Sequence, residues 1–157
     1  MGGLQKCSST KSASSYLKFH GITAPSDIQF LGRLSQQEFA QELHAADLYL
    51  AASRYEDFGM AQLEAMGSGA LVVSVPSRGP FEARSILQAV DERLLAKRAD
   101  SSDLAEAIDY ALTLDRQNRR ARVERCAALL APYLRAALLR RIETELLPEL
   151  RARTPVA

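Results

Sequence analysis

The sequence has few cysteines and little net charge, and both absences exclude classes of protein. Only two cysteines, Cys7 and Cys126, occur among 157 residues, and they lie far apart. They suit reduced thiols better than a disulfide framework, and neither belongs to a cluster with metal-ligand spacing. The 20 basic and 19 acidic residues give a formal net charge of +1. We therefore expect no nucleic acid and no strongly acidic molecule as a partner.

Long apolar runs are also absent. The first 15 residues are small and polar, without the apolar core of a signal peptide. No run approaches the ~20 apolar residues that a membrane helix needs. The sequence shows no internal repeat and no low-complexity tract. We expect a cytoplasmic protein.

Length and composition fit one globular domain. A chain of 157 residues, 47% hydrophobic and 25% charged, can bury a core but is short for two ordinary domains. We expect an α/β core over residues 1–115. Helices over residues 116–157 are expected to pack on the same domain.

Helix-like and strand-like patterns alternate along the first two thirds of the chain. Helices are predicted at residues 8–20, 36–45, 59–66 and 81–90. Short β-prone runs predict strands at residues 27–31, 47–51, 71–75 and 93–97. The second of these strands is apolar, as expected of a strand covered on both faces by helices. Because parallel strands need crossover helices, the order predicts a Rossmann-like parallel sheet flanked by helices.

Start and stop signals support several of these helices. Gly21 is a left-handed stop for the first helix, and Ser35 with Glu38 forms a capping box at the second. Three further helices are predicted at residues 100–114, 118–131 and 133–147. Pro132 and Pro148 are expected to end the last two.

The segment from Ser53 to Gly69 carries the chemistry that the sequence shows. In an open parallel sheet, ligands bind beyond the carboxyl ends of the strands. The loop before the third helix delivers Glu56 there, and the unpaired amides and dipole of the helix start at Gly59 suit a phosphate. Glu64 follows eight residues after Glu56, where its carboxylate can accept hydrogen bonds from ribose hydroxyls. On spacing alone, two solvated glutamates are the commoner explanation.

The wider pattern points to one family. Ser-x-x-Glu-x-Phe-Gly is followed by Leu-Glu-Ala-Met-x-x-Gly, with Phe30-Leu31-Gly32 before and Val72-Val73-Ser74 after. This pattern resembles the C-terminal domain of the retaining GT-B glycosyltransferases of family 4, over residues 28–82 and more weakly through the next two helices. The resemblance implies half of a GT-B fold. It also implies that Glu56 contacts the donor sugar as the catalytic residue, that the amides of Phe58, Gly59 and Met60 contact sugar and phosphate, and that Glu64 binds the ribose.

Two further segments resemble the family but leave alternatives open. The turn from Ser77 to Glu82 resembles a glycine-containing turn of the family, with Arg78 in place of its usual first glycine. Arg78 could reach a phosphate, and it is equally well explained as a solvated loop arginine. Gly32, Arg33 and Leu34 resemble the loop under the nucleotide base, or form an ordinary strand-to-helix turn.

The resemblance implies a UDP-, GDP- or ADP-sugar as donor, a hexose as the transferred group, a glycan or lipid-linked acceptor, and no cofactor or metal. It also shows departures. The family has an arginine and a lysine near the start of this domain, and an N-terminal acceptor domain before it; we expect both to be missing, with Gly2-Gly3 at the end of the second strand of the domain. We therefore expect the isolated chain to be inactive. The alternatives are a non-catalytic nucleotide-binding or interaction domain, and half of a sugar-nucleotide epimerase.

The remaining polar residues have simpler interpretations. His20 and His44 are expected to be structural or surface residues, and Asp57 to cap the helix at Gly59. Met60 and Met66 fit core or pocket lining. A set of arginines predicts the solvated face of amphipathic helices: Arg116, Arg119, Arg120, Arg122, Arg125, Arg140 and Arg141. A basic amphipathic helix can also lie on anionic lipid, so weak peripheral binding at the inner membrane face is a second hypothesis.

Overall fold

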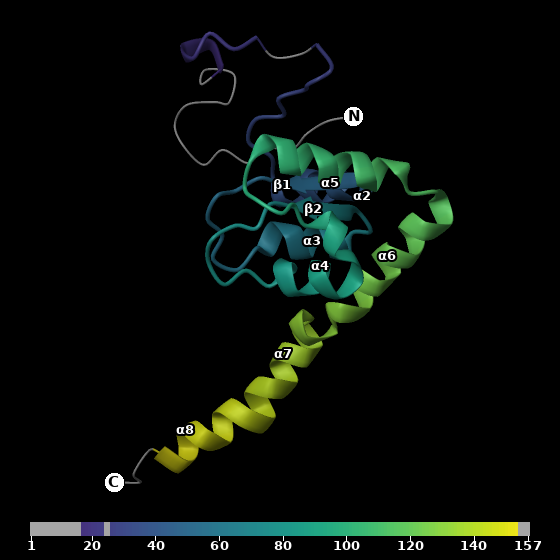
Figure 1. The fold of residues 1–157 in the computed structure, drawn as a ribbon. Helices are drawn as coiled ribbons and strands as arrows, with labels where there is room; N and C mark the ends of the chain where they lie inside the picture. The colour runs from purple at the N-terminus through teal and green to yellow at the C-terminus, as the bar shows by residue number, and fades with distance from the viewer. Residues whose placement is uncertain (1–16, 24–25, 154–157) are drawn as a thin grey trace.

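The computed structural model describes residues 17–23 and 26–153 (Figure 1). Most of the helix predicted at residues 8–20 lies outside these ranges, and residues 17–19 are helical. Gly21 follows with a φ of 65°. Its N–H donates to the Lys18 carbonyl at 3.2 Å, and the Ile22 N–H donates to the Leu17 carbonyl at 2.9 Å. This pair of hydrogen bonds is a Schellman motif, so the predicted left-handed stop is confirmed.

The sheet of the described chain has two parallel strands, β1 (Leu48–Ala51) and β2 (Leu71–Ser74). Their register runs from Leu48 opposite Leu71 to Ala51 opposite Ser74. The crossover between them contains α3 (Met60–Gly67), and α2 (Gln36–Ala45) precedes β1. All four residues of β2 are buried, but Leu50 of β1 is 38% exposed. The helices therefore leave β1 less completely covered than β2, and the exposure is largest at Leu50.

Several of the helices begin at a polar side chain that caps them. Ser35 and Glu38 form the predicted capping box of α2. Asp100 caps α5 (Ser101–Thr113) by accepting from the Asp103 N–H, and Asp115 caps α6 (Arg116–Leu129) in the same way. α4 (Ala83–Asp91) lies between β2 and α5 in the sequence and runs into the 3₁₀ turn η1 (Glu92–Leu94).

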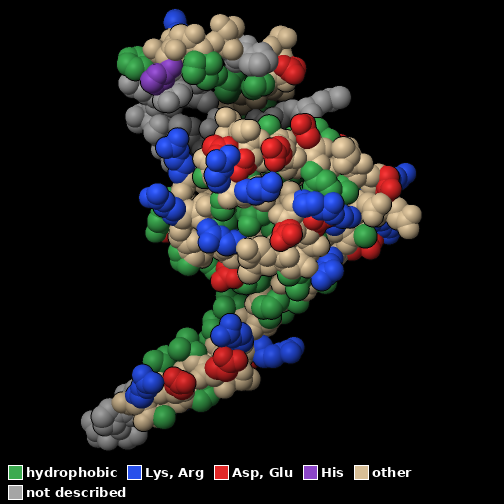
Figure 2. Space-filling view, viewed as in Figure 1, with side chains coloured by type: hydrophobic (Ala, Val, Ile, Leu, Met, Phe, Trp, Pro, Cys, Tyr) green, Lys and Arg blue, Asp and Glu red, His purple; other side chains and the backbone are tan. Residues whose placement is uncertain are grey.

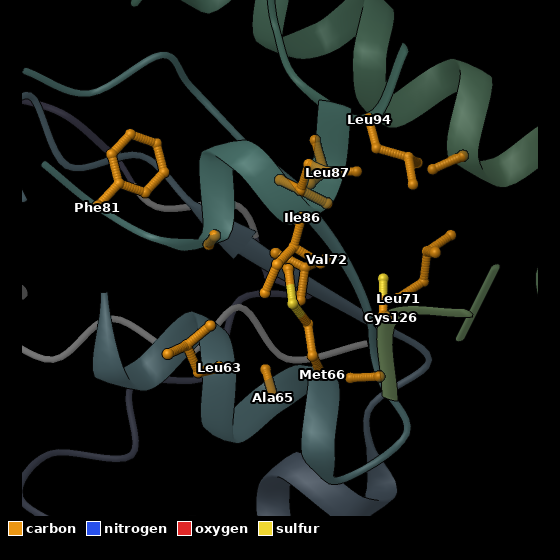
Figure 3. Close-up of a cluster of buried hydrophobic side chains, with 14 of the residues drawn as sticks. Leu63, Ala65, Met66, Leu71, Val72, Phe81, Ile86, Leu87, Leu94 and Cys126 are labelled. Carbon is orange, nitrogen blue, oxygen red and sulfur yellow. The ribbon is translucent and has the colours of Figure 1, made fainter. Parts of the chain in front are cut away.

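The core lies around β2. Figure 1 shows α5 on one side of the strands and α3 on the other, and both helices contact β2. Figure 3 shows side chains from α3, β2, α4 and α6 meeting in this core, among them Met66, Val72, Leu87 and Cys126. The result is an α/β Rossmann-like fold, as the alternation of patterns predicts.

Two predicted strands are not strands in the structure. Residues 27–31 have no strand conformation, and Ile28 and Phe30 are 43% and 40% exposed. Among the described residues no neighbouring strand offers this segment a ladder, and an apolar run gains strand structure only from such a partner. In the segment 93–97, the first two residues belong to η1. Leu95 forms an isolated parallel bridge to Ser74 of β2, and the Ala96 N–H donates to the Ser74 carbonyl at 2.8 Å.

The chain ends in a protruding helical segment, which we call the C-terminal arm (residues 134–153). The 3₁₀ turn η2 (Ala131–Tyr133) leads into α7 (Arg135–Arg141), the π-helical turn η3 (Ile142–Leu146) and α8 (Leu147–Arg153). The prediction that Pro148 ends this helix is wrong. At η3 the Leu147 N–H donates to the Ile142 carbonyl five residues back, and this wide turn accommodates the proline that follows.

The arm extends away from the body (Figure 1) and buries none of its side chains. Figure 2 shows hydrophobic side chains beside Arg and Glu along its visible face. Across the described ranges, no helix combines the length and the apolar character needed to cross a membrane.

Candidate functional site

The candidate site lies where two loops leave the carboxyl ends of the strands. The loop after β1 and the turn after β2 are joined by main-chain hydrogen bonds. The Arg78 N–H donates to the Arg54 carbonyl at 3.0 Å, and the Glu56 N–H donates to the Arg78 carbonyl at 2.9 Å. The fold thus brings the segments of Glu56 and Arg78 together although they are far apart in the sequence.

Gly79 is what allows the two loops to lie so close. It has a φ of 104°, and a Cβ at this position would collide with the main-chain carbonyl of Glu56. A residue with a side chain would therefore push the two loops apart. A hollow of about 240 Å³ lies beside the same turn, between Gly79 and the first turns of α4.

The N-terminus of α3 is open. Gly59 occupies the N-cap position with a φ of 81°, and no side chain caps the helix. The expectation that Asp57 caps it is wrong, because Gly59 takes the N-cap position and Asp57 lies two residues before it. No side chain therefore satisfies the N–H groups of the first turn, in which Met60 is exposed while Gly59 and Gln62 are buried.

The charges of both predicted glutamates affect one tyrosine. Burial raises the pKa of Tyr49, and the negative charges of Glu56 and Glu64 raise it further. Glu56 precedes the start of α3 in the sequence, and Glu64 lies within that helix. The sequence pattern does not single out Tyr49, because this residue stands in the middle of an apolar strand.

Most of the residues expected to contact a donor have exposed side chains. Phe58 is 41% exposed and Met60 58%, while Glu64 is exposed and Glu56 half-buried. Met60 and Glu64 are one helical turn apart, so they lie on the same face of α3. These residues therefore present a surface that a ligand can approach. Met66, by contrast, is buried in the core.

The residues with open alternatives are placed as follows. Gly32 and Arg33 are exposed, and Leu34 packs partly against the core. The Arg78 side chain is exposed and has no hydrogen-bond or ion-pair partner within residues 17–23 and 26–153. Its guanidinium is therefore free to bind an anion beside the Glu56 segment.

Phe58 belongs to a group of three residues that the sequence analysis did not connect. The Phe58 ring meets the Tyr133 ring edge-on, with centroids 6.1 Å apart. The Tyr133 hydroxyl donates to the Glu82 carboxylate at 2.7 Å, and the Glu82 N–H donates to the Phe58 carbonyl at 3.2 Å. No local pattern could reveal this group, because its members are dispersed along the chain.

A buried glutamine also adjoins the helix start. Gln62 is 2% exposed, and its Oε1 has no hydrogen-bond partner among the described residues. A Cβ placed on Gly59 would approach this oxygen to 2.9 Å. Gln62 therefore adds a second reason, besides the backbone conformation, for a glycine at position 59.

Other polar residues have structural roles. His44 Nδ1 lies 3.2 Å from the Ser68 carbonyl. Arg122 is 18% exposed and pairs with Asp91 at 2.6 Å, so it is wrong to assign it to a solvated helix face. Within the part of the chain that the structure describes, no group of three or more His, Cys, Asp and Glu residues could hold a metal ion.

Comparisons with known proteins identify the family. The family model described as "Glycosyl transferases group 1" matches residues 17–128. The chain is 40% identical over 58 residues to mannosylfructose-phosphate synthase of Agrobacterium fabrum (strain C58 / ATCC 33970), covering 37% of this chain and 13% of that protein. The catalytic domain of cholesterol-alpha-glucosyltransferase from Helicobacter pylori is similar with a TM-score of 0.60 and 25% identity. That similarity covers 77% of this chain and 70% of the other.

Proposed function

Because the chain belongs to the group 1 glycosyl transferases, we propose that the surface around Glu56 and Glu64 binds the nucleotide-sugar donor of a retaining glycosyltransferase. One observation carries this proposal. Main-chain hydrogen bonds to Arg78 hold the Glu56 segment at the carboxyl ends of the strands, directly before the uncapped N-terminus of α3, and α3 carries Glu64. A sugar nucleotide has the matching parts: a sugar, a diphosphate and a ribose.

Each part of the donor has a proposed contact. The ribose hydroxyls donate to the exposed carboxylate of Glu64. The diphosphate accepts from the free amides at the start of α3, where the helix dipole favours negative charge. The half-buried carboxylate of Glu56 accepts from the hydroxyls of the sugar, beside the reacting carbon. The name of the Helicobacter pylori enzyme specifies α-glucosyl transfer, which supports a hexose as the transferred group.

We also propose that this chain alone does not transfer the sugar. Breaking the bond between sugar and phosphate leaves a nucleoside diphosphate, whose growing charge needs cationic groups facing it. Near the Glu56 segment, the described structure offers the uncommitted guanidinium of Arg78. In the family that the chain resembles, an arginine and a lysine near the start of this domain neutralise the diphosphate, and a separate N-terminal domain binds the acceptor. Product formation by the purified chain, measured with labelled donor, would contradict this part of the proposal.

Donor binding is tested by thermal unfolding with a panel of UDP-, GDP- and ADP-sugars. A ligand at about 100 times its dissociation constant stabilises the folded state by about 2.7 kcal/mol, which is a shift of several degrees. We expect one member of the panel to give such a shift and Glu64→Ala to remove it. Glu106→Ala, an exposed glutamate on α5, is the matched control and should retain it. No shift with any sugar nucleotide would reject the proposal.

A further inference from the structure

Phe58, Glu82 and Tyr133 form a closed ring of contacts beside the open end of α3. Phe58 and Tyr133 are joined by their rings, Tyr133 and Glu82 by a hydrogen bond between side chains, and Glu82 and Phe58 by one between main-chain groups. The hydrogen bond from a hydroxyl to a carboxylate belongs to the strong, charge-assisted kind. We call these three residues the loop latch.

The latch is anchored in the core through Tyr133. The Tyr133 N–H donates to the Leu130 carbonyl at 2.9 Å, and the Leu130 side chain is 6% exposed and belongs to the core. Phe58 and Tyr133 themselves are 41% and 38% exposed. Burial therefore does little to fix Phe58, and its contact with an anchored ring becomes more important for its position.

The latch also sets the direction of a main-chain amide. In a planar trans peptide, the carbonyl of one residue and the N–H of the next point in opposite directions. Glu82 holds the Phe58 carbonyl, so the Gly59 N–H is directed away from Glu82. Gly59 has a φ of 81° and no side chain of its own. Gly59 itself is held by the Leu63 N–H, which donates to its carbonyl at 3.1 Å, and the hydrogen bond to the Phe58 carbonyl fixes the peptide group on the other side of Gly59.

We propose that Tyr133 is a positioning residue of the donor site, which holds Phe58 and Glu82 so that the Gly59 amide faces the sugar and second phosphate of the donor. This inference rests on the proposed function. It adds that a residue outside the donor-binding loop and helix, at the base of the C-terminal arm, controls donor affinity. The alternative role for Tyr133 is structural, as a packing residue of the turn into the arm.

Comparing the binding of two ligands, one with and one without the sugar and second phosphate, distinguishes the positioning role from the structural one. Isothermal titration would compare the sugar nucleotide that stabilises the parent chain with the corresponding nucleoside 5′-monophosphate, which lacks the second phosphate and the sugar. Tyr133→Leu removes both latch contacts of the tyrosine, and Tyr133→Phe removes only the hydrogen bond to Glu82. Leu134→Ala is the matched control, since Leu134 is 58% exposed and takes no part in the latch.

We expect Tyr133→Leu to raise the dissociation constant of the sugar nucleotide roughly tenfold. The dissociation constant of the monophosphate should change by less than about twofold. Tyr133→Phe should give an intermediate loss, and Leu134→Ala none. An unchanged affinity for the sugar nucleotide in Tyr133→Leu would overturn the inference. So would an equal loss for both ligands, which is the result of a purely structural role.

A second measurement keeps the inference testable if the proposed function fails. Should the parent bind no sugar nucleotide, amide hydrogen exchange of Glu82 and Leu63, whose N–H groups donate to the carbonyls of Phe58 and Gly59, would be compared in the parent and in Tyr133→Leu. Faster exchange of these two amides in the variant, with unchanged exchange in β2, supports a positioning role. Equal exchange in both proteins would overturn it.

Discussion

Gly59 is the residue on which the open end of α3 depends most directly. Its φ of 81° is a left-handed conformation, and a Cβ there would also approach the buried Gln62 oxygen to 2.9 Å. Gly69 also has a positive φ, 89°, but a Cβ at that position would meet nothing within 4 Å. Substituting alanine at each glycine therefore distinguishes two losses of stability. Gly69→Ala measures the loss from the left-handed backbone alone, and Gly59→Ala adds the loss from the contact with Gln62.

We expect Gly69→Ala to lower the free energy of unfolding by about 1 kcal/mol, the cost of a left-handed alanine. Gly59→Ala should lower it by roughly 2–3 kcal/mol, because Gln62 has to move as well. Urea unfolding of the three proteins measures both values. Equal losses for the two variants would show that the contact with Gln62 costs nothing.

Cys126 is a residue whose chemistry follows from burial alone. It is 2% exposed, and burial raises the pKa of its thiol to about 11. Because the thiolate is the reactive form, we expect this thiol to resist disulfide reagents at pH 8 while the chain is folded. In a Cys7→Ser variant, the reagent should react with Cys126 only at the rate of unfolding, and it should react at once in denaturant. Fast reaction of the folded variant would contradict the burial.

The sequence can point to candidate site residues only where they share one local pattern. Glu56, Gly59 and Glu64 lie within one loop and helix, so their spacing carries information about the chemistry, and their roles stay predictions. Tyr133 contacts Phe58 and Glu82 from the turn after α6. These contacts cross the fold, and spacing along the chain does not encode them.

Among the elements, α4, η1, α5 and α6 meet at one carboxylate. Asp91 accepts hydrogen bonds from Arg93, Tyr110 and Arg122. Its side chain is 7% exposed. Burial on its own would raise the pKa of Asp91, but the hydrogen bonds outweigh it and hold the pKa well below the usual range of an aspartate. Asp91 therefore joins the end of α4 to the two helices that follow.

This junction should make the fold sensitive to acid. A depressed pKa means that Asp91 contributes stability above its unfolded pKa of about 3.9, and that this stability is lost as the pH falls below that value. We expect Asp91→Asn to lower the free energy of unfolding by roughly 2 kcal/mol at pH 7. The difference between parent and variant should shrink as the pH falls below about 4.

Urea unfolding between pH 7 and pH 3 tests this expectation. Asp109→Asn is the control, since Asp109 is exposed on α5, next to Tyr110. The control should follow the parent at every pH. If Asp91→Asn has the same effect at pH 3 as at pH 7, the ionised carboxylate is not what stabilises the junction.

Elements with their own signals are predicted well from the sequence. The capping box at Ser35 and the cap at Asp100 are local, and both helices begin where predicted. The run at residues 27–31 is equally local, but a strand also needs a neighbour, and a segment cannot specify that by itself. The run 93–97 meets the sheet only at Ser74, through the bridge of Leu95 and the hydrogen bond of the Ala96 N–H, and forms no full strand.

At the scale of the whole molecule, the alternation of helices and strands predicts the α/β fold, because it follows from how parallel strands must be connected. The arm is different. Its sequence has the leucine content of a packed helix, but in the structure its leucines are exposed, with Leu134, Leu138 and Leu150 between 51% and 58%. The leucine content of the arm therefore indicates a helix, but it does not indicate what that helix packs against.

The body should not need the arm for its stability. No side chain of α7, η3 or α8 is buried, while α6 and the residue after it place Cys126 and Leu130 in the core. We expect a chain that ends at Leu134 to keep the melting temperature of the parent within about 2 °C, a difference of well under 1 kcal/mol. A chain that ends at Leu114 loses both core residues and should not fold cooperatively.

Calorimetry and circular dichroism of the two shortened chains distinguish these outcomes. A large loss of stability in the chain ending at Leu134 would mean that the arm packs on the body in solution. The exposed leucines add a second expectation, since large apolar surfaces favour association. The shortened chain should therefore remain monomeric at concentrations where the parent associates, because the apolar side chains that drive association have been removed with the arm.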